Sequence, residues 1–421
     1  MRTTIIIYCV CLLSSFASAF SGSGSGIESN PYVITTIEQL QEIQDDLEAC
    51  YVLGNDIDAS ATASWNDGAG FEPIGYSLED GTIVAFTGTF NGQCHVISNL
   101  YINRPGTDGV GLFGHINDGA VIENVGLDTA DISARRDSGL LVGNLNNSII
   151  GNSWSSGDIR GTYNGQMRLG GLVGISTGYN SLIYQCFSSS NITAFGGAQQ
   201  IGGLAGYNGH GSVISDCYAT GHVSGTSKVG GLVGDNIYGS RGTLIERCYS
   251  TGKLSGDGGG LVGSNWNDGV TTDSYWDINT SGKSSSYGGT GKTTTQMMQQ
   301  STFAGWDFEN VWLIEEDQTY PYLVPPICTL NDLVGRQLNE AIEHKIRAIE
   351  ELELAIGNET IAWNALNEAI MNDDYTDLSK GEIQYLKAKV SLSIQAEEMV
   401  RDKIYININV LADLVSELYM E

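Results

Sequence analysis

The chain has 421 residues, enough for two domains, and its 55 glycines are about twice the usual share. The formal net charge is −29 at pH 7. Such an acidic surface argues against nucleic acid and anionic membranes as partners, because both bind basic faces.

The first 19 residues are expected to be a secretory signal peptide. Arg2 is a short basic start, residues 5–13 form an apolar core, and residues 17–19 read Ala-Ser-Ala, an A-x-A cleavage pattern. The apolar stretch is too short to span a membrane, and no spanning segment appears later. The sequence therefore predicts an exported protein, secreted or at the cell surface, cleaved near Ala19 and beginning with a flexible lead-in at 20–29.

A short amphipathic helix is predicted next. Residues 35–38 read Thr-Thr-Ile-Glu, which is typical of a capping box, and Ile37, Leu40, Ile43 and Leu47 follow at helical spacing. An open end of a strand-built solenoid exposes core side chains and unpaired backbone, so we expect this helix to cover the first coil.

A repeated unit then runs from about residue 110 to residue 276. Each copy has a first apolar run like Gly-Leu-Val-Gly and a second apolar run, which reads Ile-x-x-Cys-aromatic in three copies, separated by Gly, Ser, Asn and Thr. The glycines that end the first run are spaced by 28–32 residues: Gly114, Gly143, Gly174, Gly206, Gly234 and Gly263. A fixed period in this range indicates stacked units of short strands, because one unit cannot bury its apolar side alone. The fold class is therefore predicted to be mainly β, a parallel β-helix over residues 30–325.

These repeats resemble the GLUG motif, found in bacterial surface adhesins and in the non-catalytic repeat region of IgA-specific metallopeptidases. The flanking segments 51–58, 86–92 and 288–323 resemble the same proteins. The resemblance implies the β-helix and an adhesion or scaffold role in a bacterial protein. It does not carry the peptidase activity, because none of the five histidines belongs to a His-Glu-x-x-His motif.

The composition changes after Pro326, where glycine becomes rare and a seven-residue alanine column begins. The column is Ala341, Ala348, Ala355, Ala362 and Ala369. With a turn at 372–377 and a second apolar stripe after it, this pattern predicts an antiparallel α-helical hairpin over residues 327–421. The small column allows a partner helix to approach closely, so the hairpin is expected to act as spacer, anchor or self-association element.

One column of the repeat carries charge. It reads Asn124, Asn152, Gln185, Asp216, Arg247 and Asp273. Coils ~4.8 Å apart would place Asp216 and Asp273 roughly 9.6 Å apart with Arg247 between them, near the upper limit for an inverting glycosidase pair. These three residues support an alternative function, a polysaccharide-active glycoside hydrolase or lyase. The simpler interpretation is a ladder of alternating charge.

The next column holds small side chains, three of them thiols: Val125, Ser153, Cys186, Cys217, Cys248 and Ser274. A straight ladder of thiols does not converge on a tetrahedral centre, so the column predicts buried packing and no metal site. The segment 289–293 resembles a phosphate-binding loop but lacks its first glycine, which is replaced by Ser286. No cofactor is predicted.

The third column is aromatic and supplies the predicted ligand-binding residues: Trp154, Phe187, Tyr218, Tyr249 and Tyr275. If these side chains face solvent, they form a platform on which sugar rings of a surface glycan can stack, or to which a protein partner can bind. The alternative is an aromatic ladder that only holds adjacent coils together. The sequence favours a non-catalytic adhesion or scaffold protein over the enzyme.

A disulfide bond is predicted between Cys50 and Cys94. Both residues open the pattern Cys-x-Val-x-x-Asn, in successive coils. If the two patterns stack in register, their Cα atoms lie ~4.8 Å apart, inside the ~4.4–6.8 Å range that a bridge requires. An exported protein meets oxidising conditions in which such a bond persists.

Overall fold

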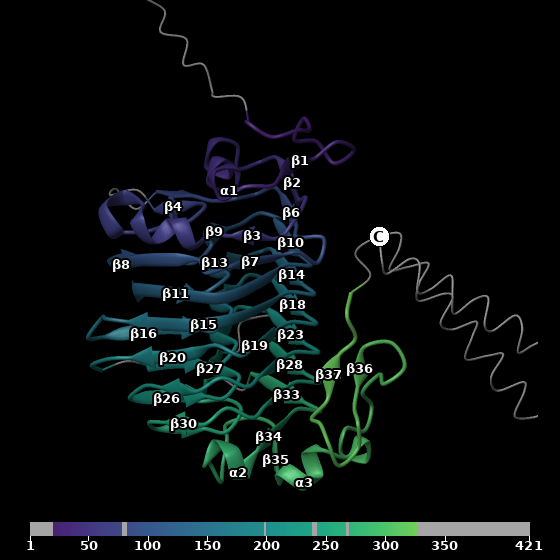
Figure 1. Ribbon diagram of the computed structural model, residues 1–421. Helices are drawn as coiled ribbons and strands as arrows, with labels where there is room; N and C mark the ends of the chain where they lie inside the picture. Colours follow the sequence, from purple (N-terminus) through teal and green to yellow (C-terminus); the bar gives the residue numbers. More distant parts are fainter. Residues whose placement is uncertain (1–19, 78–81, 198, 238–241, 267–268, 327–421) are drawn as a thin grey trace, which may run out of the picture. The chain divides into compact units, whose positions relative to one another are not determined.

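The computed structural model describes residues 20–77, 82–197, 199–237, 242–266 and 269–326. The chain divides into two compact units, residues 1–326 and 327–421. The predicted signal peptide and the predicted helical hairpin therefore lie outside the described residues. The described part is mainly β with few helices, and its short strands stack coil upon coil into a parallel β-solenoid (Figure 1).

Two long parallel sheets run along the solenoid, the first built from one short strand per coil and the second from one or two strands per coil. The first has nine strands: β1 (Tyr32–Ile34), β2 (Cys50–Leu53), β6 (Thr89–Asn91), β10 (Val121–Glu123), β14 (Ile149–Gly151), β18 (Leu182–Tyr184), β23 (Val213–Ser215), β28 (Leu244–Glu246) and β33 (Val270–Thr272). The second has 13 strands: β3 (Ile57–Asp58), β7 (Val96–Ser98), β8 (Tyr101–Asp108), β11 (Gly126–Arg136), β15 (Trp154–Gly161), β19 (Phe187–Ser188), β20 (Asn191–Ala194), β24 (Tyr218–Ala219), β25 (Val223–Ser224), β29 (Tyr249–Ser250), β30 (Leu254–Ser255), β34 (Tyr275–Asp277) and β35 (Thr290–Lys292).

Two shorter parallel sheets complete the coils. One has five strands: β12 (Ser138–Gly139), β16 (Gln166–Gly170), β21 (Gln199–Gly202), β26 (Ser227–Gly230) and β31 (Gly258–Gly259). The other has six: β9 (Phe113–Ile116), β13 (Val142–Asn146), β17 (Val173–Thr177), β22 (Ala205–Gly209), β27 (Val233–Ile237) and β32 (Asn265–Trp266). Antiparallel hairpins pair β4 (Tyr76–Ser77) with β5 (Ile83–Val84) and β36 (Trp312–Leu313) with β37 (Tyr322–Leu323).

The Gly-Leu-Val-Gly runs supply the interior. Leu172, Leu204 and Leu232 are fully buried, and Val173, Ala205 and Val233 pair in register across β17, β22 and β27. The glycine pair before each leucine is needed for close approach of the coils. A Cβ on Gly203 would lie 2.1 Å from the carbonyl oxygen of Gly231 in the next coil. The repeat in the sequence thus corresponds to one coil of the core.

Helices are short. They are α1 (Ile37–Glu42), α2 (Ile278–Ser281) and α3 (Thr294–Met297), with 3-10 turns η1 (Ile43–Asp45), η2 (Ser60–Ser64), η3 (Asn66–Gly68) and η4 (Gln300–Thr302). Helix α1 begins after its N-cap residue Thr36, whose side chain accepts a hydrogen bond from the backbone amide of Gln39. The capping interaction therefore involves Gln39 and not Glu38, the residue that the sequence pattern indicated. Its buried residues Ile37 and Leu40 join the main core. Within the described ranges no helix is long and apolar enough to cross a membrane.

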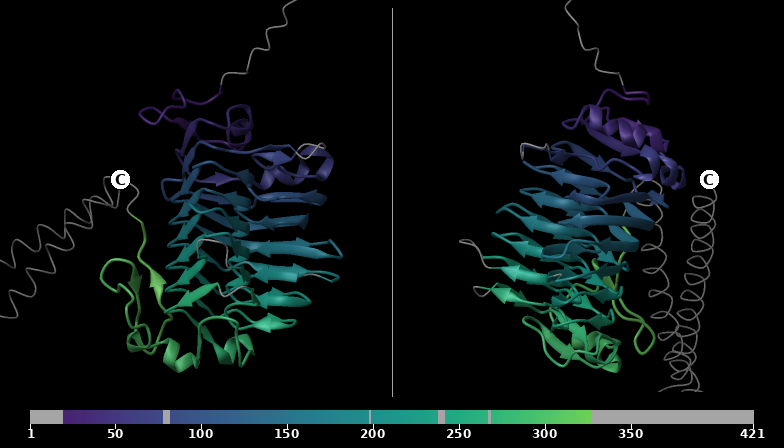
Figure 2. Two further views of the ribbon diagram at one scale, coloured as in Figure 1. Left: turned by 180° about the vertical axis from the view of Figure 1, so that it is seen from behind. Right: turned by 90° about the vertical axis from the view of Figure 1, so that its left-hand side faces the viewer.

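Residues 293–326, which we call the C-terminal segment, turn back along the side of the solenoid, as both views of Figure 2 show. Four of its side chains, Met297, Phe303, Trp306 and Trp312, form a second hydrophobic core with Tyr249. This cluster packs against the aromatic side chains Tyr249 and Tyr275 on the side of the solenoid.

Candidate functional site

The charged column lies at a sharp corner of each coil. All six of its residues have a positive φ, between 45° and 56°: Asn124, Asn152, Gln185, Asp216, Arg247 and Asp273. Asparagine and aspartate adopt this left-handed conformation more readily than most residues, which explains much of the column's composition. The corner geometry, which the sequence interpretation missed, governs this position more than charge alternation does.

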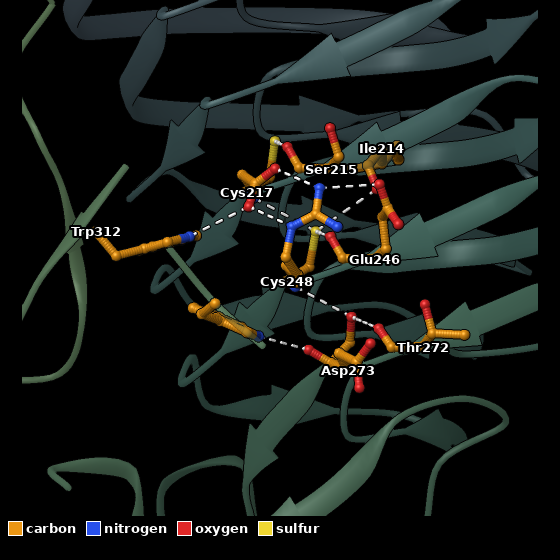
Figure 3. Close-up of polar contacts among 12 residues, drawn as sticks. Ile214, Ser215, Cys217, Glu246, Cys248, Thr272, Asp273 and Trp312 are labelled. Carbon is orange, nitrogen blue, oxygen red and sulfur yellow. Dashed lines mark hydrogen bonds and ion pairs between the residues drawn. The ribbon is translucent and has the colours of Figure 1, made fainter. Parts of the chain in front are cut away.

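Asp216 forms an ion pair with Arg247 at this corner. Figure 3 shows the surrounding polar contacts, with Glu246, Asp273 and Trp312 labelled. Nε and Nη2 of Arg247 each donate to one Asp216 carboxylate oxygen at 2.8 Å, and Nη2 also donates to Glu246 at 2.9 Å. Trp312 of the C-terminal segment donates from Nε1 to Oδ1 of Asp216 at 3.3 Å. The hydrogen bonds from Asp216 raise the pKa of Arg247 above its usual value.

This arrangement does not support the polysaccharide-active enzyme. Both carboxylate oxygens of Asp216 are hydrogen-bonded, and the residue is 9% exposed beneath Trp312. A general acid or base must reach the proton that it transfers. Asp273 is exposed, but its backbone carbonyl accepts a hydrogen bond from Nε1 of Trp306 at 2.8 Å, so the C-terminal segment lies over this corner too. The structure brings Asp216 and Arg247 together as a structural pair.

The small column forms a hydrogen-bonded series inside the solenoid. The thiol of Cys217 donates to the Ser215 carbonyl at 3.1 Å and accepts the Cys186 amide at 3.4 Å. Ser274 does the same with its hydroxyl, which accepts the Cys248 amide at 3.0 Å. Burial raises the pKa of the Cys217 thiol. In the described part of the chain, no group of three or more His, Cys, Asp and Glu side chains is arranged to hold a metal ion.

The aromatic column forms a stack of nearly parallel rings. The ring centroids of Trp154 and Phe187 are 5.7 Å apart, those of Phe187 and Tyr218 are 4.9 Å apart, and those of Tyr218 and Tyr249 are 5.0 Å apart. The interplanar angles are 6°, 3° and 5°. Tyr275 pairs in register with Tyr249 but meets Phe303 edge-on at 5.3 Å. Such stacking holds successive coils together.

The C-terminal segment covers the lower part of this stack. Tyr249 is 2% exposed, and its hydroxyl donates to the carbonyl oxygen of Pro321 at 2.6 Å. The ring centroid of Trp312 lies 6.1 Å from the ring centroids of both Tyr218 and Tyr249. Burial raises the pKa of Tyr218 to about 12. Tyr249 is therefore closed to an external ligand, which corrects its prediction as a binding residue.

The upper end of the stack opens into a groove. A cavity of about 220 Å³ is lined by Asn152, Ser153, Trp154, Gln185, Phe187, Leu323, Val324, Pro325 and Pro326. Its walls are the two upper rings on one side and the end of the C-terminal segment on the other. The sequence identified Trp154 and Phe187 but not the opposite wall. The Pro325-Pro326 pair was its only signal, since it marks the end of the β-rich sequence.

The predicted Cys50–Cys94 disulfide is wrong. Cys50 carries a free thiol, whereas Cys94 is disulfide-bonded. The reason is register: Cys50 of β2 pairs with Thr89, while the pattern that Cys94 opens continues into β7, where Ile97 pairs with Ile57. The two similar patterns therefore lie in different sheets of the coil. Sγ of Cys94 lies 3.7 Å from the carbonyl oxygen of Pro326, at the end of the C-terminal segment.

Comparison with known proteins supports the repeat. The family model described as the GLUG motif matches residues 197–224. Halomucin of Haloquadratum walsbyi is 41% identical over 174 residues, which cover 40% of this chain and 2% of that protein. A provisionally named Gly-rich membrane protein of Evansella cellulosilytica is 34% identical over 131 residues, or 31% of this chain and 14% of that protein. The chain thus spans a small part of the relatives that it matches.

A solved structure shares the fold. The crystal structure of a provisionally named immunoglobulin A1 protease from Bacteroides ovatus superposes with a TM-score of 0.54 at 22% identity. The match covers 72% of this chain and 95% of that one. The likeness to GLUG-repeat proteins and to the repeat architecture of IgA1 protease proteins, expected from the sequence, is confirmed.

Proposed function

We propose that the protein is an exported, non-catalytic adhesion or scaffold protein that binds a glycan at the open end of its aromatic stack. The GLUG repeat, the β-helix shared with an IgA1 protease protein and the names of the two relatives support a surface role. The groove beside Trp154 and Phe187 is the observation that carries the binding proposal.

The chemistry of this groove suits a sugar ring. Trp154 and Phe187 line the groove with the edges of their stacked rings, because Phe187 lies between Trp154 and Tyr218. These apolar ring edges can pack against the apolar face of a sugar. The amides of Asn152 and Gln185 line the same cavity and offer both donors and acceptors to hydroxyl groups. Mainly apolar walls with a few polar groups are typical of small-ligand sites. Tyr218 and Tyr275 then serve as structural rungs under the C-terminal segment.

The remaining parts of the chain have supporting roles in this proposal. Residues 1–19 direct export and are removed near Ala19. Helix α1 covers the first coil, where Ile37 and Leu40 close the core. The hairpin at 327–421 acts as a spacer, an anchor or a self-association element.

A glycan array with the full-length protein tests the proposal. Trp154→Ala should reduce binding of the best glycan about fivefold to a hundredfold, because loss of one apolar ring from the groove removes about 1–3 kcal/mol. Trp266→Ala is the matched control, since Trp266 is 62% exposed and lies outside the groove. Equal binding by both variants would remove the groove from the function. If the wild-type protein binds no glycan but binds a protein in a manner that depends on Trp154, the partner is a protein and the glycan assignment is wrong.

A further inference from the structure

A second cavity, of about 560 Å³, lies on another part of the solenoid. Its walls come from the segment that leads into β4, from the end of β8 and from Arg135 near the end of β11. Figure 1 shows β4, β8 and β11 stacked in this order at the upper part of the solenoid, and the aromatic groove is lined by none of these residues.

The backbone makes room for this cavity by an irregularity between β8 and β11. Arg104 pairs with Ala134, and Asp108 pairs with Arg136. Between these two pairs β8 advances by four residues and β11 by only two, so β8 has two extra residues. The extra residues of β8 bow outwards, as expected for a bulge. Hydroxyl Oγ1 of Thr162, two coils further on, donates to the carbonyl of Pro105 at 2.9 Å and supports the bowed segment.

The opposite wall is fixed by the N-terminal helix. The side chain of Gln41 makes two hydrogen bonds to the backbone of Glu72, both at 2.9 Å. Four residues further along, Tyr76 presents a ring that is 40% exposed at the edge of the cavity. The cavity therefore has a positioned wall with one carboxylate and one aromatic ring.

Cationic and anionic side chains are balanced around this cavity, but one of the cations has no carboxylate partner among the described residues. Asp108 accepts hydrogen bonds from Nη1 of Arg135 at 3.0 Å and from Nε of Arg136 at 2.8 Å, so one carboxylate serves two guanidinium groups. Arg104 also lines the cavity, and among the described residues its side chain makes one hydrogen bond, from Nε to the Phe71 carbonyl at 3.3 Å. Its terminal nitrogens are left to bind a ligand.

This local balance of charge stands out in a chain of net charge −29. Two arginines, Arg104 and Arg135, line the cavity together with two carboxylates, those of Asp108 and Glu72. A planar guanidinium group binds a carboxylate through two parallel hydrogen bonds. The two carboxylates in the wall disfavour a ligand that is anionic all over, such as a polyphosphate, and suit hydroxyl groups, which donate to them.

We propose that this cavity binds a carboxylated sugar. The terminal nitrogens of Arg104 take the carboxylate, Asp108 and Glu72 accept hydrogen bonds from ring hydroxyls, and the Tyr76 ring packs against the sugar face. This site rests on the adhesive function proposed above and deepens it by naming an acidic class of glycan. Its test is separable, because the aromatic groove contributes none of these residues.

Calorimetric titration of the full-length protein tests this site with three probes: a uronate-terminated glycan, a sialate-terminated glycan and a neutral glycan of equal length. One or both acidic probes should bind at least tenfold more tightly than the neutral one, and this binding should weaken as salt is added. Arg104→Gln should reduce it about tenfold to a hundredfold, because a charge-assisted pair of hydrogen bonds is lost.

Arg160→Gln is the matched control. Arg160 is a partly exposed arginine that pairs with Asp131 and Asp158 and does not line the cavity. Its variant should bind like the wild type. Trp154→Ala should leave acidic binding unchanged while it weakens binding in the groove. Melting curves show whether Arg104→Gln remains folded, and Tyr76→Ala provides a second, independent loss. Equal affinity for acidic and neutral probes, or undiminished binding by folded Arg104→Gln, would overturn the proposal.

Discussion

Trp312 donates a hydrogen bond from Nε1 to the carboxylate of Asp216, which precedes it by 96 residues, at 3.3 Å. The same carboxylate accepts both hydrogen bonds from Arg247, at 2.8 Å each. One buried side chain thus joins two successive coils and fastens the C-terminal segment to them. A pair that the sequence suggested as catalytic is, in the structure, a fixing point.

Replacement of Trp312 by phenylalanine tests this fixing point. Phenylalanine keeps an aromatic ring in the second core but loses the N–H donor, so the free energy of unfolding should fall by about 1–3 kcal/mol. Chemical denaturation and limited proteolysis within residues 293–326 measure the loss. Trp266→Phe, at a residue that is 62% exposed, should be neutral. A Trp312→Phe protein as stable and as resistant as the wild type would show that the bond contributes nothing.

The small column predicts a graded response at Cys217. Cys217→Ser should lower the free energy of unfolding only slightly. Ser274, which occupies the same column two coils further on, already makes both hydrogen bonds that the thiol makes. Cys217→Leu should cost about 1–3 kcal/mol, because a larger side chain is forced into a fully buried site and the acceptor is lost. Urea denaturation midpoints measure both variants. A silent Cys217→Leu would contradict the burial of this column.

The buried tyrosines predict loss of stability at alkaline pH. Burial raises the pKa of Tyr218 from 10.0 to about 12, and burial together with the Asp277 hydrogen bond raises that of Tyr320 to about 12. A phenol whose pKa is higher in the folded state stabilises the fold fully below its unfolded pKa. That stabilisation is lost as the pH rises from about 10 to about 12.

A pH titration followed by tyrosinate absorbance and circular dichroism measures this loss. Tyr218→Phe keeps the ring stack with Phe187 and Tyr249 but removes the ionisable group, so its alkaline unfolding should begin at higher pH. If the variant and the wild type unfold at the same pH with the same amplitude, Tyr218 does not control the transition.

The repeat allowed much of the solenoid to be predicted. A periodic sequence aligns its own coils, so the residues of the aromatic column and of the small column could be assigned to the same level of successive coils from their spacing alone. The pairing of Tyr218 with Tyr249 confirms this register. The left-handed corner was less visible because Gln185 and Arg247 occupy positions where asparagine or aspartate would have signalled it.

Contacts outside the repeat could not be predicted. No period relates Trp312 to Asp216 or Pro321 to Tyr249, so the cover over the lower rings had no signal in the sequence. The Cys50–Cys94 disulfide was wrongly predicted because a short sequence pattern does recur, but in two different sheets of the solenoid. The similar sequences of the two segments do not mean that they pair in register.

The paired glycines of the repeat give the last prediction. A Cβ at Gly203 would lie 2.1 Å from the carbonyl oxygen of Gly231 and 2.8 Å from Cβ of Ala219. Neither atom is the end of a flexible side chain, so the coils must separate to admit a methyl group. Gly203→Ala should therefore lower the free energy of unfolding by at least about 2 kcal/mol.

Gly106→Ala is the matched control, because a Cβ there meets no atom within 4 Å and the backbone φ is ordinary. Its effect should stay within about 0.5 kcal/mol, as for most surface substitutions. Thermal melting of both variants, with circular dichroism to confirm the β content, decides the matter. Equal stability of Gly203→Ala and Gly106→Ala would mean that the coils can move apart locally at this point. The glycine pair would then reflect the chain's turn preferences and not close contact between the backbones of adjacent coils.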